Sequence, residues 1–216
     1  MKKISTVQTM TLDGGDPSLD FVNSGYDCQP GILAERLHEY ADLLTLSLRV
    51  GLLQQDVIEV FSRYAKVHPA KAIDALEKTR EVRGALYELL IGRINPEEIS
   101  VDNFALDTFN RYLGEALRYR KVAVAGGEFS KDWIVDEYDL EFPLRRFVID
   151  YYELITGPRQ GLIKQCDGCA WFFLDQSKNH RRRWCDMSSC GNIEKVRRYY
   201  GKRKVAKEDT SENRDA

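Results

Sequence analysis

Histidines are few in this sequence, and no long uncharged hydrophobic run occurs in it. The opening MKKISTVQTMTLDGG alternates polar and apolar residues, so it lacks the continuous apolar core of a secretory signal. No uncharged apolar stretch approaches the roughly 20 residues that a membrane-spanning helix needs. We therefore expect a cytoplasmic protein with no membrane partner.

A recognisable catalytic set is also lacking. His38 and His68 stand alone, and they fit helix-surface or packing positions better than an active site. We therefore do not expect an enzyme. Cytosolic thiols are kept reduced, so clustered cysteines in this compartment favour metal binding or redox chemistry over disulfides.

The 216 residues are 43% hydrophobic, enough for one sizeable core or for one core with a small appended module. Charge is unevenly distributed. Residues 1–165 hold 20 basic and 26 acidic residues, a net charge of −6, whereas residues 166–204 hold 10 basic and 4 acidic residues, a net charge of +6. A basic segment on an acidic body is typical of polyanion binding, although a solvated charged surface gives the same pattern.

Hydrophobic periodicity predicts helices over about 32–51, 54–67, 69–94, 101–119 and 140–156, with Pro143 in the first turn of the last one. Residues 4–12 alternate as a short strand does, and Gly126 with Gly127 indicates a β-hairpin. These patterns predict a mainly α fold with a small antiparallel β component. In the N-terminal segment LDFVNS, Asp20 and Asn23 either cap and turn the backbone or hold a ligand.

Four of the five cysteines lie close together. Cys166 and Cys169 form C-x-x-C, and Cys185 and Cys190 form C-x-x-x-x-C after fifteen intervening residues. Two close pairs at this separation can direct four thiolates at one ion, which predicts one structural Zn²⁺ in a C-terminal zinc-ribbon or treble-clef-like module. Gly168 suits a tight turn that needs a positive φ.

Other roles for the thiols fit less well. A thioredoxin-like pair would open a helix, but Cys169 precedes the β-prone AWFFLD. Catalytic zinc needs an open coordination position, which four cysteines close. His180 in the polar loop is an alternative ligand, and Cys28 is an ordinary thiol or a fifth ligand.

We expect a β-hairpin through AWFFL and RRRWC, and a final helix from Cys190 that turns Ile193, Val196 and Tyr200 inward. Trp171, Phe172, Phe173 and Trp184 either fill the small core or stack on bases. If the metal holds the loop and the helix side by side, their basic residues form one nucleic-acid-binding patch. Its members are Lys178, Arg181, Arg182, Arg183, Lys195, Arg197 and Arg198.

The segments CDGCAWFFLD, RRRWC and CGN resemble the CGNR zinc finger of bacterial proteins with an N-terminal ABATE domain, which are described as stress-induced transcription regulators. LDFVNS is similar to the opening motif of that family, so the resemblance spans nearly the whole chain. It places the zinc ligands on the same four cysteines and CGN on Cys190, Gly191 and Asn192. Ile193 stands where the family motif has arginine.

This resemblance implies DNA binding and transcriptional control, with a body that senses a small-molecule effector, forms a homodimer, or does both. An RNA-binding protein and a protein-interaction module with a purely structural zinc ribbon remain the alternatives, because the basic module does not distinguish the two polymers. We divide the chain into a mostly helical ABATE-like domain over 1–158, a zinc finger over 159–204 and a disordered acidic tail over 205–216.

Overall fold

The computed structural model describes residues 5–26, 34–94, 97, 100–136, 138–193 and 195–196. Within these ranges the fold is mainly helical with two small antiparallel sheets, as the sequence predicted. The helices are α1 (Pro17–Asn23), α2 (Tyr40–Arg49), α3 (Gln55–Val67), α4 (Pro69–Ile94), α5 (Asn103–Leu117) and α6 (Phe142–Thr156). Cys28 and the predicted tail over 205–216 lie outside the described residues.

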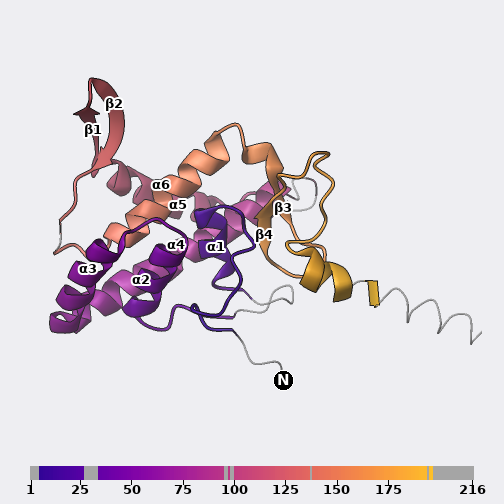
Figure 1. The fold of residues 1–216 in the computed structure, drawn as a ribbon, viewed down its shortest axis with the longest axis horizontal. Coiled ribbons are helices and arrows are strands. Elements are labelled where there is room, and N and C mark those ends of the chain that lie inside the picture. Colours follow the sequence, from indigo (N-terminus) through magenta and orange to yellow (C-terminus); the bar gives the residue numbers. More distant parts are fainter. Residues whose placement is uncertain are drawn as a thin grey trace, which may run out of the picture.

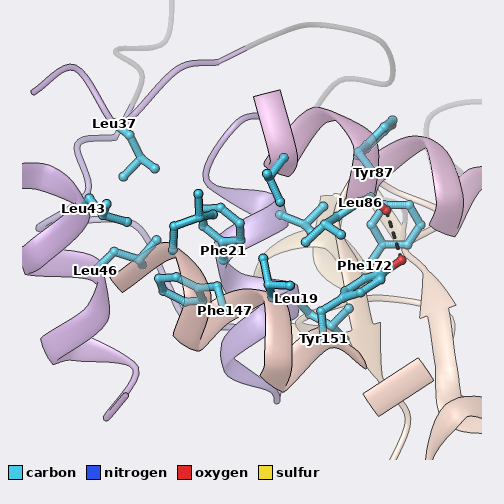
Figure 2. Packing of buried hydrophobic residues seen from close by; sticks show 14 of the residues in the cluster. Leu19, Phe21, Leu37, Leu43, Leu46, Leu86, Tyr87, Phe147, Tyr151 and Phe172 are labelled. Atoms are coloured by element: carbon cyan, nitrogen blue, oxygen red, sulfur yellow. Dashed lines mark hydrogen bonds between the residues drawn. The ribbon is translucent and has the colours of Figure 1, made fainter. Parts of the chain in front are cut away.

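Helix α4 is the long element against which most of the others pack. It contacts α1, α2, α3 and α5, and α6 in turn lies against α1 and α5 (Figure 1). Figure 2 shows Leu19 and Phe21 of α1 between Leu86 of α4 and Phe147 of α6. Because α1 is enclosed on these sides, a seven-residue helix becomes a central part of the core.

One hydrogen bond in this core joins two elements directly. The Tyr151 hydroxyl of α6 donates to the Leu86 carbonyl of α4 at 3.2 Å (Figure 2). Burial raises the pKa of Tyr151, because the phenolate would lose its hydration. The hydroxyl therefore remains a neutral donor, and it fixes α6 against α4.

The predicted helices over 54–67, 69–94, 101–119 and 140–156 are confirmed, with the residue bounds of α3, α4, α5 and α6. The helix predicted over 32–51 is only partly right, because α2 begins at Tyr40. There, Glu39 and Asp42 exchange side-chain and backbone hydrogen bonds in a capping box, and this arrangement starts the helix.

The strand predicted in the N-terminal segment is wrong, and a helix there was not predicted. Residues 7–9 form a turn instead of a strand, and the turn buries Val7 and Met10. Arg49 holds this turn by donating to the carbonyls of both residues. The segment LDFVNS, for which no helix was predicted, belongs largely to α1, whose first turn is capped by Asp16.

The first sheet is the hairpin predicted at Gly126 and Gly127, made of β1 (Arg120–Ala125) and β2 (Glu128–Trp133). Both glycines have positive φ, as the connecting turn requires. The hairpin extends from the helical body at the end opposite the cysteine-containing segment (Figure 1). None of the described helices is both long and apolar enough to cross a membrane.

The second sheet belongs to the C-terminal part of the chain. After a short 3₁₀ turn (η1, Gln160–Leu162), β3 (Ile163–Gln165) pairs with β4 (Phe172–Leu174). A π-helical turn (η2, Met187–Gly191) follows. The hairpin predicted through AWFFL and RRRWC is therefore wrong in its partner: AWFFL pairs with the strand before the first cysteine, and RRRWC forms no strand.

Candidate metal centre

Cys166 and Cys169 lie on the turn that joins β3 to β4. The Cys166 N–H donates to the Trp171 carbonyl at 2.9 Å, which closes the turn, and the Gly168 N–H points at the Cys166 sulfur at 3.4 Å. The φ of Gly168 is not positive, so that prediction is wrong. A side chain there would be crowded, because a Cβ at Gly168 would lie 3.2 Å from the Cβ of Cys190.

Cys185 and Cys190 are placed by η2. The Asp186 carboxylate caps this turn, accepting from the N–H groups of Ser188 at 3.1 Å and Ser189 at 2.7 Å. The wide π-helical turn then closes with the Gly191 N–H on the Asp186 carbonyl. Cys190 therefore lies inside the helical turn, one turn later than its expected place at the start of a helix.

The four thiols converge on one point. Their sulfur atoms all lie within 4.8 Å of one another, and all four residues are buried. The Cys169 and Cys185 sulfurs are 3.7 Å apart, as are those of Cys185 and Cys190. A tetrahedral ion with Zn–S bonds of about 2.3 Å requires sulfur–sulfur distances of about 3.8 Å. The cluster fits one Zn²⁺ with all four positions closed, and zinc would hold the two turns together.

The charge balance of the cluster also favours a cation. Hydrogen bonds from Cys169 and Cys185 lower the pKa of Cys166, so its thiolate forms first. The hydrogen bond with Cys166, together with its negative charge, raises the pKa of Cys185, and burial raises the pKa of Cys190. Without an ion these thiols therefore favour one thiolate beside neutral thiols, and a bound cation would be needed for all four to ionise.

His180 does not join this cluster. Its Nδ1 lies 2.9 Å from the Asp175 carbonyl oxygen in the exposed loop. Its backbone has a φ of 47°, which shapes the loop between the two cysteine pairs. The described candidate ligands are therefore the four cysteines alone.

Asn23 attaches the metal-binding segment to the helical body. Its side-chain amide donates to the Phe172 carbonyl at 2.9 Å and accepts from the Phe172 N–H at 2.8 Å. This pair of bonds is what a neighbouring β-strand would supply, so the side chain at the end of α1 extends the sheet beside β4. Asn23 is fully buried, and water does not compete with these bonds.

Two further bonds strengthen the same junction. The Trp171 indole N–H donates to the Tyr26 carbonyl at 2.7 Å, and the Leu174 N–H donates to the Gly14 carbonyl at 2.8 Å. Phe172 lies edge-on to Tyr87 of α4, with ring centroids 5.3 Å apart (Figure 2). The buried aromatic residues therefore fill a core, which was one of the two roles predicted for them. This core is shared by the finger and the body.

Asp20 lies in the same N-terminal region and is also buried. Its Oδ1 accepts from the Gly14 N–H at 2.8 Å, which fixes the loop that contacts β4. Burial raises its pKa to about 7, and the Gly14 bond opposes this shift. Asp20 and Asn23 therefore have structural roles, and the ligand-binding role considered for them stays a prediction.

The basic residues between the cysteine pairs divide into two groups. Arg182 donates to the carbonyls of Trp184 and Cys185 and lies over Phe173, and Arg183 pairs with Asp167 at 2.5 Å. These two guanidinium groups therefore bind backbone and carboxylate groups of the metal-binding turns.

The second group faces solvent. Lys178, Arg181 and Lys195 are exposed, and their side chains form no hydrogen bond or ion pair within the described part of the chain. Arg197 and Arg198 lie outside the described residues, as does Tyr200. Arg183 is exposed as well, but it pairs with Asp167. The single patch formed by all of these residues stays a prediction.

The apolar residues of the last described helical turns are oriented differently from the prediction. Ile193 and Val196 were expected to face inward, but they are 49% and 54% exposed. The buried part of the finger packs on the body instead, where α1 contacts β4 and Tyr87 of α4 lies against Phe172. That prediction is wrong because the finger is packed on the body and does not enclose a core of its own.

Family models match two segments of the chain. The ABATE model, described as "Putative stress-induced transcription regulator", matches residues 15–158, and the model described as "CGNR zinc finger" matches residues 163–203. No curated protein matches the chain. The second match contains all four clustered cysteines, in agreement with the geometry of one zinc site.

Proposed function

Because the chain belongs to the ABATE family and ends in a CGNR zinc finger, we propose that it regulates transcription by binding duplex DNA through that finger. Zinc closes the two cysteine turns and so holds the basic loop and the terminal helical turns in place. The metal has a structural role in this proposal, and the protein acts by binding without catalysing a reaction.

The placement of the basic side chains carries the proposal. Arg182 is engaged in the finger itself and the exposed Arg183 pairs with Asp167, whereas Lys178, Arg181 and Lys195 are exposed without such a partner among the described residues. Exposed cations on a metal-braced surface are suited to phosphate oxygens, which attract them without regard to sequence. The acidic charge of the body disfavours a second polyanion site there.

The body would receive the signal that the finger transmits. Helix α1 contacts α4 and α6 on the body side and β4 on the finger side, so a rearrangement of the body would move β4 through Asn23. A small-molecule effector and a homodimer are part of this proposal. Calorimetric titration with candidate effectors tests the first, and light scattering of the zinc-loaded protein tests the second.

The experiment is a binding titration of zinc-loaded protein with duplex DNA and with single-stranded and duplex RNA, at several salt concentrations. The charge-reversal variant is Lys178→Glu with Arg181→Glu. Its matched control is Arg63→Glu with Lys66→Glu, an exposed pair on α3, which lies across the body from the finger (Figure 1). We expect the first variant to weaken DNA binding much more than the second, and the salt dependence to become less steep.

Preferential binding to RNA would mean that RNA, and not DNA, is the ligand. Equal reductions of affinity in both variants would mean that the finger cations do not bind the nucleic acid. Absence of binding to either polymer at low salt would overturn the nucleic-acid function and leave a protein-interaction module.

A further inference from the structure

Two exposed apolar side chains that follow η2 remain without a role in the fold. Ile193 and Val196 are three residues apart, so they lie on one face of the helix. About half of each side chain is in contact with solvent. Helix α1 and Tyr87 already cover the buried face of the finger, so this apolar pair adds nothing to that core.

The start of the same helical segment is not free to hold a phosphate. The Asp186 carboxylate occupies the first N–H groups, and its negative charge would repel an anion at that end. The side of the helix is therefore the part that can meet a ligand. Lys195 is exposed between the two apolar residues in the sequence, and residues 166–204 carry a net charge of +6.

We infer that Ile193 and Val196 contact thymine methyl groups in the major groove of duplex DNA, which gives the finger a preference for thymine. This inference rests on the proposed function. The major groove is wide enough to admit an α-helix, and the thymine C5-methyl group is the apolar feature of base edges there. Basic side chains would hold the phosphates while the apolar pair meets the methyl groups.

Ile193 also explains how this chain can differ from others with the CGNR motif. An arginine at that position could donate two hydrogen bonds to guanine, whereas isoleucine can only make apolar contacts. The Ile193→Arg variant should therefore lose the preference for thymine and still bind DNA, because a cation is added near the phosphates.

The test compares thymine with uracil, which lacks only the methyl group. Duplexes enriched by the zinc-loaded, full-length protein from a random thymine-containing pool are resynthesised with uracil in place of thymine. We expect affinity to fall by about fourfold for each buried methyl group that the replacement removes. In Ile193→Ser, affinity for the thymine duplex should fall toward that of the uracil duplex, while affinity for the uracil duplex stays nearly unchanged. Phe104→Ser, an exposed apolar position on α5, is the matched control and should preserve the difference.

The outcomes separate the two proposals. If thymine and uracil duplexes bind equally, DNA binding stands and the methyl contact is refuted. If Ile193→Ser weakens both duplexes alike with its zinc content intact, Ile193 acts in some other way and the inference is also refuted. If no duplex is bound or enriched, the proposed function fails, and the inference fails with it.

Discussion

Replacing Asn23 with alanine should loosen the finger from the body. The substitution removes both bonds to Phe172 and leaves a buried N–H and a buried carbonyl without partners. Each unsatisfied buried group costs about 1–3 kcal/mol, so the expected loss of unfolding free energy is about 4 kcal/mol. For a chain of this size that corresponds to a fall of about 8–16 °C in the melting temperature.

The control is Asn192→Ala. Asn192 also donates its side-chain amide to a carbonyl, that of Ser188 at 2.9 Å, but this residue is exposed and water can replace the bond. Its loss should cost less than about 1 kcal/mol. The two variants therefore remove the same chemical group from a buried and from an exposed position.

The assay is thermal unfolding of zinc-loaded protein followed by tryptophan fluorescence. Trp171 reports on the junction, because its indole N–H donates to the Tyr26 carbonyl across it. If Asn23→Ala melts as late as Asn192→Ala, the amide does not carry the attachment and the reasoning about the shared core is wrong.

Elemental analysis of the purified protein should find one zinc per chain. A Cys166→Ser, Cys190→Ser double variant should lose the metal and unfold at lower temperature. Retention of zinc with unchanged affinity in this variant would contradict the site. Arg181→Ala should lower the slope of log affinity for DNA against log salt concentration by about 1 without changing stability. Arg182→Ala should lower the free energy of unfolding, measured by calorimetry, by about 1.5–3 kcal/mol. Because its folded-state pKa of about 7 exceeds the unfolded value of about 4, Asp20 should make stability fall as pH rises between these values, by up to about 4 kcal/mol. Asp20→Asn keeps the acceptor for Gly14 and should flatten unfolding curves over this window; an unchanged pH dependence would refute the assignment.

Local patterns predicted the long elements well. The segment from Pro69 to Ile94 is helical over its whole predicted length, since its alanine, leucine, glutamate and lysine residues all favour a helix. The hairpin at Gly126 was equally visible, because the turn needs residues that tolerate positive φ. Helix α1 was missed, because seven residues show too little periodicity to separate a helix from a turn.

The metal site was predictable for a related reason. Each pair of cysteines is joined by a short turn, so the spacing alone limits where the sulfurs can point. The attachment of the finger to the body was not predictable, because Asn23 and Phe172 lie 149 residues apart. No local pattern shows that an amide at the end of α1 will act as a strand for β4.

The sequence by itself therefore determined the helices α3 to α6, the hairpin and the four cysteines that could hold one zinc, whose signals lie within a few residues of one another or in two spaced pairs. Only the tertiary structure separated Arg181 from Arg182, which are adjacent and of the same type: one faces solvent and the other donates to backbone carbonyls. It also decided that Ile193 is exposed, and that the finger packs on α1 and on Tyr87 of α4. The physical reason is that burial depends on which elements meet in space, and residue type and spacing do not record that.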